Sequence, residues 1–235
     1  MQRNIEILPD RSALITKALS CVLEAYERSI EAHGQFTIAV AGGGTPRPLY
    51  EALAEQSLDW SKVHVFWGDE RYVPSTDPQS NEGMVRKAWL DRVSIPSENI
   101  HPMPTNYPDP ATAAQSYEAE LQSFFGKEQG EFPSLDLILL GIGDDGHTAS
   151  LFPGTDALKV FDRLITVGKK DDRPRITFTA PLINQAKEIM FLVEGSAKTK
   201  ALQAILAESG DSNIYPSRLI QGNVTWLIER SAWEP

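Results

Sequence analysis

His147 is the residue whose neighbours in the sequence most strongly indicate chemistry. It lies in the stretch GIGDDGHTAS, directly after the apolar run LDLILL, with Asp144 and Asp145 three and two residues before it. A carboxylate beside an imidazole can orient the ring and support its charged form, as a general base requires. Gly146 gives the backbone the freedom to place the ring tightly. The spacing predicts a histidine that activates a water molecule.

Other kinds of site fit this stretch less well. Gly141, Gly143 and Gly146 have the spacing of a dinucleotide-binding loop, but such a loop must open a helix, and Pro153 interrupts the chain too soon. A serine nucleophile often lies in the pattern Gly-x-Ser-x-Gly, which the sequence lacks. The four histidines include no His-x-x-x-His pair, and there is one cysteine, so no metal centre is expected. We therefore expect neither NAD, nor a metal, nor another cofactor.

A second glycine-rich loop, AGGGTPRPLY, is a candidate anion site. Gly42, Gly43 and Gly44 let backbone N–H groups approach an anion closely, and Thr45 can donate a hydroxyl hydrogen bond. The loop lacks the Gly-Lys-Ser/Thr ending of a P-loop, so a nucleoside triphosphate is not expected. The alternative interpretation of this loop is a tight turn between a strand and the helix that Pro46 opens.

The composition restricts the class of ligand. The chain has 235 residues, 41% of them apolar, and a formal net charge of −10. A surface this acidic repels nucleic acid and anionic lipid, so neither nucleic acid nor a membrane is an expected partner. A small phosphate ester would need a pocket where cations gather, and the candidates are Arg71, Arg86, Arg175 and Lys198. Each of these could also be an ordinary solvated charge.

The sequence favours a soluble protein of the cytoplasm. Its single cysteine, Cys21, excludes an internal disulfide framework and fits a reducing compartment. The N-terminus has no apolar stretch of signal-peptide length, and no run approaches the ~18 apolar residues that span a membrane. No linker divides the chain, so we expect one domain over residues 1–235. The sequence does not determine the oligomeric state, and a monomer is favoured.

Strands and helices alternate along the predicted chain. Helices are predicted at 10–32, 46–56, 81–90, 110–125 and 196–208, and strands at 36–41, 63–68, 135–141, 163–167, 175–179, 188–193 and 224–228. This alternation predicts an α/β fold with a Rossmann-like, mostly parallel sheet and helices on both faces. Ligands bind such sheets at the carboxyl ends of strands. The loops 42–45, 68–83 and 141–150 follow predicted strands, so we expect them to form one pocket.

A family resemblance covers nearly the whole chain. Its stretches are AGGGTPRPLYEAL, VFWGDERYVPSTDPQSNEGMVRKAWL, LDLILLGIGDDGHTASLFPG, RITFTAPLINQAKEIMFLVEGSAKTKAL and PSRLIQGNVTWLIERSA. Together they resemble the lactonases of the glucosamine-6-phosphate isomerase/6-phosphogluconolactonase family. The resemblance implies the fold of glucosamine-6-phosphate deaminase and ribose-5-phosphate isomerase. It also implies hydrolysis of 6-phospho-D-glucono-1,5-lactone to 6-phospho-D-gluconate, the second step of the oxidative pentose phosphate pathway.

The deaminases of this related fold are the competing interpretation. They typically have Asp-Glu-Tyr where this chain has Asp69-Glu70-Arg71, and Gly-His-Ile-Ala-Phe-Asn-Glu-Pro where it has GHTASLFPG. Their glutamate, five residues beyond the histidine, assists ring opening of the sugar, whereas Phe152 at this position cannot move a proton. A non-catalytic sugar-phosphate-binding regulator is a further alternative, against which the DGHT context of His147 argues.

The resemblance also implies roles for the candidate residues. His147 would take a proton from the attacking water, while Asp145 would orient its ring or hold N–H groups of the loop. The expected phosphate-binding groups are Gly42, Gly43, Gly44, Thr45, Arg71, Arg86 and Lys198.

Two residues keep more than one expected role. Arg175 matches the family pattern without a defined function, and the alternative for it is an ion pair with Asp69 or Glu70. Asp69 would tether Arg71 or bind sugar hydroxyls, and the loop 72–83 is the candidate lid.

Overall fold

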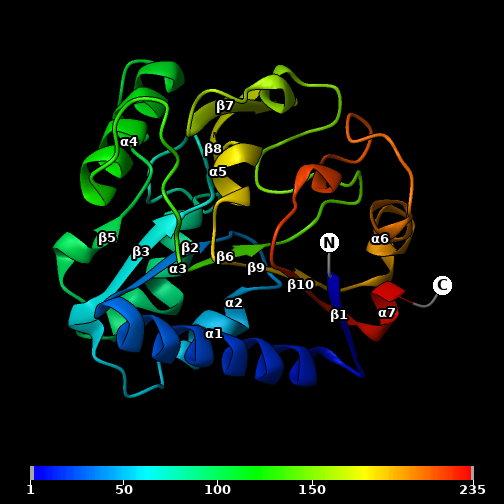
Figure 1. The fold of residues 1–235 in the computed structure, drawn as a ribbon, viewed down its shortest axis with the longest axis horizontal. Coiled ribbons are helices and arrows are strands. Elements are labelled where there is room, and N and C mark those ends of the chain that lie inside the picture. The colour runs from blue at the N-terminus through cyan, green and yellow to red at the C-terminus, as the bar shows by residue number, and fades with distance from the viewer. Residues whose placement is uncertain (1–2, 234–235) are drawn as a thin grey trace.

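A seven-stranded parallel sheet lies at the centre of this computed structural model, which describes residues 3–233 (Figure 1). Its strands run in the order β1 (Arg3–Leu8), β10 (Val224–Glu229), β9 (Glu188–Val193), β6 (Leu137–Leu140), β2 (Phe36–Val40), β3 (Val63–Trp67) and β5 (Ile100–His101). Each neighbouring pair is parallel. Every residue of β2 and β6 is buried, as expected for strands covered on both faces. The predicted α/β fold with a mostly parallel sheet is confirmed.

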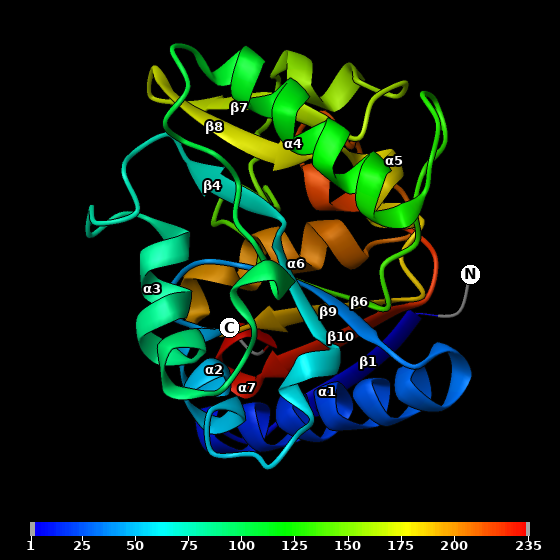
Figure 2. The ribbon, with the colours of Figure 1, turned by 90° about the vertical axis from the view of Figure 1, so that its left-hand side faces the viewer.

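Helices lie on both sides of this sheet (Figure 2). The helices α1 (Arg11–His33) and α2 (Arg47–Leu53) lie along one face, and α4 (Pro110–Phe125) lies on the side of the other. The remaining helices are α3 (Asn81–Ala88), α5 (Ala180–Asn184), α6 (Thr199–Leu206) and α7 (Arg230–Trp233). No helix within residues 3–233 combines the length and apolar character that crossing a membrane requires.

The long helix α1 begins and ends where its sequence signals predict. The side chain of Asp10 accepts a hydrogen bond from the backbone N–H of Ala13, which satisfies one of the free donors at the helix start. Gly34 ends the helix with φ at 80°, a conformation that glycine adopts without steric cost. Between these caps, Leu14, Ala18 and Val22 are buried against the core.

A second, antiparallel sheet corrects the prediction that all the strands belong to one sheet. It consists of β4 (Asp69–Arg71), β8 (Arg173–Phe178) and β7 (Ile165–Lys170), and we call it the small sheet. The predicted loop 68–83 therefore begins with a strand, and the strands predicted at 163–167 and 175–179 pair with each other. They form a hairpin because Asp171 and Asp172 adopt φ values of 50° and 60°, as tight hairpin turns require.

Besides β4, two strands and two helices were not predicted from the sequence: β1, β5, α5 and α7. Strand β1 lies at the edge of the large sheet and leaves Ile5 and Ile7 exposed. The other three have two to five residues, too few for a periodic pattern. Between His147 and β7 the only helix is the four-residue 3-10 helix Asp156–Lys159, in line with the expectation that no long helix opens directly after this loop.

Both sheets share one hydrophobic core. Ile38 and Leu139 of the large sheet belong to the same buried cluster as Ile176 and Phe178 of the small sheet. The small sheet is therefore packed into the body of the protein, and the loops between the two sheets have defined positions.

Candidate functional site

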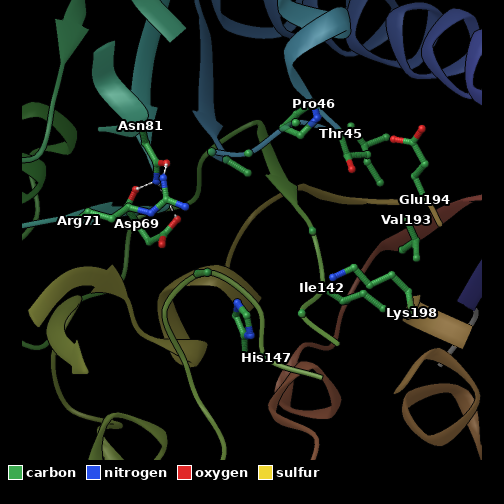
Figure 3. Close-up of a pocket in the computed structure, with 18 of the residues that line it drawn as sticks. Thr45, Pro46, Asp69, Arg71, Asn81, Ile142, His147, Val193, Glu194 and Lys198 are labelled. Carbon is green, nitrogen blue, oxygen red and sulfur yellow. Dashed lines mark hydrogen bonds between the residues drawn. The ribbon is translucent and has the colours of Figure 1, made fainter. Parts of the chain in front are cut away.

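A cavity of about 300 Å³ lies at the carboxyl ends of the parallel strands (Figure 3). The loops after β2 and β6 line it, as do the strand β4 that follows β3, the first residue of α3 and the segment after β9. The predicted site residues that the structure brings to this cavity are Gly42, Gly43, Gly44, Thr45, Asp69, Arg71, His147, Arg175 and Lys198. The cavity therefore lies where a parallel α/β sheet usually binds its ligand.

His147 and Asp145 form a hydrogen-bonded pair at this cavity. The Nδ1 atom of His147 lies 2.5 Å from Oδ1 of Asp145, and the same oxygen accepts the backbone N–H of His147 at 3.1 Å. The carboxylate of Asp145 thus orients the ring and also holds an N–H group of the loop, the two roles that the sequence analysis gave as alternatives. Because the carboxylate accepts the proton on Nδ1, the lone pair of the neutral ring is on Nε2, which has no hydrogen-bond partner within residues 3–233. Nε2 can therefore act as a proton acceptor.

The loop that carries the pair is held from a distant part of the chain. Ser217 donates two hydrogen bonds to the carbonyl of Gly146, from its Oγ at 2.8 Å and from its N–H at 3.1 Å. Gly146 has φ at +79°, and a Cβ atom on it would lie 2.6 Å from the ring of Tyr215. Sequence reasoning missed Tyr215 and Ser217, because neither lies near the motif and their contacts come only from the fold.

The imidazole of His147 is largely removed from water. Its side chain is 20% exposed, and its ring centroid lies 4.5 Å from that of the buried Phe152. This burial lowers the pKa of His147, and Lys170 lowers it further, while Asp145 and Asp69 oppose the shift. Burial alone would raise the pKa of Asp145, but its hydrogen bonds from His147 lower it overall. At neutral pH the pair is therefore a neutral imidazole beside an ionised carboxylate.

This arrangement predicts opposite pKa changes in two variants. We expect Phe152→Leu to raise the pKa of His147, since water reaches the ring, and Asp145→Asn to lower it, since the supporting charge is removed. NMR titration of the His147 ring protons measures both pKa values, with thermal unfolding as the control for an intact fold. Shifts of the same sign in the two folded variants would contradict this account of the site.

Asn81 connects Asp69 and Arg71, an acidic and a basic residue that both line the cavity. Its Nδ2 donates to the backbone carbonyl of Asp69 at 2.8 Å, and its Oδ1 accepts from Nη1 of Arg71 at 2.5 Å (Figure 3). The expected tether between Asp69 and Arg71 is thus indirect. Sequence reasoning missed Asn81, although its place at the start of a helix after a strand-end loop was a usable signal. The carboxylate of Asp69 is held separately, since its Oδ2 accepts a hydrogen bond from the hydroxyl of the buried Ser150 at 2.6 Å.

Glu70 does not face the cavity but holds the loop that leads to Asn81. It is 1% exposed, and its carboxylate accepts the N–H groups of Asn81 and Glu82 at 2.8 and 2.7 Å. Burial raises the pKa of Glu70, and these hydrogen bonds oppose the shift. The segment between β4 and α3 is therefore fixed at both ends by one buried carboxyl group.

The remaining basic residues have different surroundings. The ammonium group of Lys198, at the edge of the cavity, donates a hydrogen bond to the carboxylate of Asp144. Arg175 lies with Nη1 4.0 Å from Oδ2 of Asp69, so the ion pair considered as an alternative is present at long range. Arg86 does not line the cavity, because its Nε bonds Glu82 one turn earlier in α3 at 2.7 Å.

The glycine loop after β2 presents free backbone donors. Neither Gly43 nor Gly44 donates its N–H to another residue within the described part of the chain, and both line the cavity. Gly43 has φ at 101°, and Gly42 lies so close to Asn81 that a Cβ atom would overlap the amide. The loop therefore needs glycine for its shape, and that shape leaves N–H groups available to an anion.

Several known proteins are similar to this chain in sequence and in fold. The family described as glucosamine-6-phosphate isomerases/6-phosphogluconolactonase matches residues 9–227. A 6-phosphogluconolactonase of Nostoc sp. is 56% identical over 234 residues, which are 99% of this chain and 98% of the relative. The crystal structure of a 6-phosphogluconolactonase from Thermotoga maritima is 30% identical, with a TM-score of 0.85 over 97% of this chain and 100% of that chain. A monomeric glucosamine-6-phosphate deaminase, 20% identical, shares the fold with a TM-score of 0.82 over 97% of this chain and 98% of that one.

Proposed function

The chain belongs to the glucosamine-6-phosphate isomerase/6-phosphogluconolactonase family, and we propose that His147 is the group with which it opens its substrate. The substrate is 6-phospho-D-glucono-1,5-lactone, and the enzyme hydrolyses this cyclic ester to 6-phospho-D-gluconate. One observation carries the proposed role: the Nε2 atom of a neutral, carboxylate-oriented imidazole is free in a cavity that is also lined by cations and backbone donors.

The proposed reaction needs one base and one water molecule. Nε2 of His147 takes a proton from the water as its oxygen bonds to C1 of the lactone, and the carbonyl oxygen becomes negatively charged. A backbone N–H or a basic side chain of the cavity stabilises that charge. The bond between C1 and the ring oxygen then breaks, and His147 returns its proton to the ring oxygen. Asp145 stays ionised and keeps the ring oriented through Nδ1.

We place the phosphate of the substrate on the side of the cavity that faces the base. Its candidate donors are the N–H groups of Gly43 and Gly44, the hydroxyl of Thr45 and the side chain of Lys198. Arg71 and Arg175 add guanidinium groups, which suit phosphate oxygens. No role is proposed for Arg86, since it lies outside the cavity.

A direct assay tests the function. The protein is incubated with freshly generated lactone, and acid release is followed above the spontaneous background. A parallel incubation with glucosamine 6-phosphate measures ammonia release. We expect acid release only, since Phe152 packs on His147 and offers no group that transfers a proton. Ammonia release without lactone hydrolysis would reverse the assignment.

The pH dependence of kcat/KM should follow the ionisation of His147. The base is active when neutral, so kcat/KM is expected to be flat near pH 7 and to fall about tenfold per pH unit below the pKa of His147. Because burial lowers that pKa, the decline should begin below the ordinary histidine value of ~6.5. Rates corrected for spontaneous hydrolysis measure this, and a decline centred above pH 7 would contradict a neutral base.

Removing a phosphate-binding cation should act mainly on substrate binding. For Arg71→Gln and Lys198→Gln we expect KM to rise by about tenfold or more, since a hydrogen bond to a charged group contributes roughly 1.5–3 kcal/mol. The change in kcat should be smaller, because neither side chain contacts the His147–Asp145 pair. Arg86→Gln is the matched control, with KM unchanged. An unaltered KM in both test variants would remove these residues from the phosphate site.

The cellular setting of the enzyme completes the proposal. We place the reaction in the oxidative pentose phosphate pathway, in the cytoplasm, where a chain with one cysteine meets reducing conditions. Residues 1–235 would act as one catalytic domain, as the shared core of both sheets favours. A monomer would suffice, since the cavity described above is built from one chain.

A further inference from the structure

A second cavity, of about 570 Å³, adjoins the catalytic one and shares Arg71 and Arg175 with it. We call it the outer cavity. Its lining residues come from the β7–β8 hairpin and from β4 and the loop that follows it. Its charged lining residues are Arg71, Lys170, Asp171, Arg173 and Arg175, so four cations face one carboxylate. In a chain with a net charge of −10, such a surplus of positive charge is a local exception.

Three of these cations have no carboxylate partner within residues 3–233. Arg71 donates to the neutral oxygens of Gln79 and Asn81, and Arg173 has one long hydrogen bond, at 3.4 Å, to the Gln79 side chain. The ammonium group of Lys170 lies 5.4 Å from the centre of the Phe152 ring and forms no ion pair. By contrast, the adjacent Lys169 pairs with Asp172 at 2.6 Å.

The two shared arginines also keep unused donors. The Nε atoms of Arg71 and Arg175 are buried and have no hydrogen-bond partner in the described structure. Burial lowers the pKa of Arg175, and the neighbouring charge of Arg71 lowers it further, although Asp69 opposes both. Gathering like charges in a partly buried place costs free energy, and a bound anion would offset that cost.

We propose that the outer cavity is a second binding site for a phosphate-class anion, inorganic phosphate or a phosphate monoester, which can be occupied while the catalytic cavity is filled. The inference rests on the proposed function, because the proposed function assigns the phosphate of the lactone to the catalytic cavity. Arg71 and Arg175 face both cavities, and each guanidinium has five N–H donors. An anion in the outer cavity would share these donors with the substrate, so phosphate should act as a partial inhibitor that raises KM to a limiting value.

The test is a calorimetric titration of inorganic phosphate into the enzyme saturated with 6-phosphogluconate, which fills the catalytic cavity. We expect the wild-type chain to bind one phosphate under these conditions. The double variant Lys170→Gln/Arg173→Gln should bind it about tenfold or more weakly, since two charged donors are lost. Lys169→Gln is the matched control, because Lys169 is on the same hairpin, pairs with Asp172 and lies outside both cavities.

Two results would overturn the proposal: displacement of all phosphate by 6-phosphogluconate, or wild-type phosphate affinity in the double variant. If the double variant does not fold, the single variant Arg173→Gln serves in its place, because Arg173 is exposed and its replacement should leave the fold intact. Lactone hydrolysis in phosphate-free buffer is measured on the same preparations. Its absence would refute the proposed function, whereas the comparison of phosphate affinities does not depend on turnover.

Discussion

Replacing His147 with alanine should lower kcat by about 10²–10⁴-fold, the usual contribution of a positioned general base. The lactone carbonyl is already electrophilic, so the missing step is removal of the proton from the attacking water. The groups that line the rest of the cavity remain in place, and KM should change little. Steady-state rates above the spontaneous background measure both constants.

A matched control separates loss of the base from general damage. His64 is a partly buried histidine that packs on His101 and Phe124, and it does not line the catalytic cavity. We expect His64→Ala to retain most of kcat, even if it unfolds at a lower temperature. Turnover near the wild-type value in a folded His147→Ala protein would refute the role of His147.

The second large effect is expected from Gly143→Ala, which adds one methyl group next to the His147–Asp145 pair. A Cβ atom on Gly143 would lie well within 3.0 Å of Nδ1 and Cε1 of His147 and of Oδ1 of Asp145. The ring, the carboxylate or the loop must move, so the 2.5 Å hydrogen bond between them is lost or rearranged. We expect kcat to approach that of His147→Ala, with a smaller change in the temperature of unfolding.

Gly141→Ala is the control for this prediction. Gly141 also lines the cavity, but the nearest atom to its Cβ would be the carbonyl oxygen of Leu192 at 3.9 Å, an ordinary contact. Activity should therefore stay within a few-fold of wild type. If Gly143→Ala is as active as Gly141→Ala, the close packing around the catalytic pair has no functional importance. Two of the three glycines in the dinucleotide-like spacing thus have a steric reason, since Gly143 makes room for the pair and Gly146 for Tyr215.

Local signals predicted much of the large sheet and of the site. Strand β9 has its predicted limits, and α1 lies within one residue of its predicted ones, because buried apolar runs and helix caps are read from neighbouring residues. The loops after β2 and β6 met in one cavity because parallel strands end at the same edge of a sheet. The choice of His147 and Asp145 as a pair followed from their separation of two residues.

What the sequence left undetermined depends on partners that are distant in the chain. An apolar pattern indicates a strand but not its neighbour, so the small sheet was not foreseen. The same limit applies to Asn81, whose contacts with Asp69 and Arg71 span ten residues or more. The prediction that Arg86 binds the phosphate was wrong. Its spacing of four residues from Glu82 is typical of an ion pair on a helix surface, and that is where the structure places it.

The division of the molecule into two sheets has a consequence for engineering. The base, its carboxylate and the glycine loop are attached to the large parallel sheet, whereas Asp69, Arg71 and Arg175 belong to the small one. In the proposed function, the large sheet carries the base, and both sheets contribute groups that bind the anionic end of the substrate. A library aimed at uncharged lactones should therefore vary Arg71 and Arg175 of the small sheet together with the loop 42–45, and leave the loop that carries His147 and Asp145 untouched.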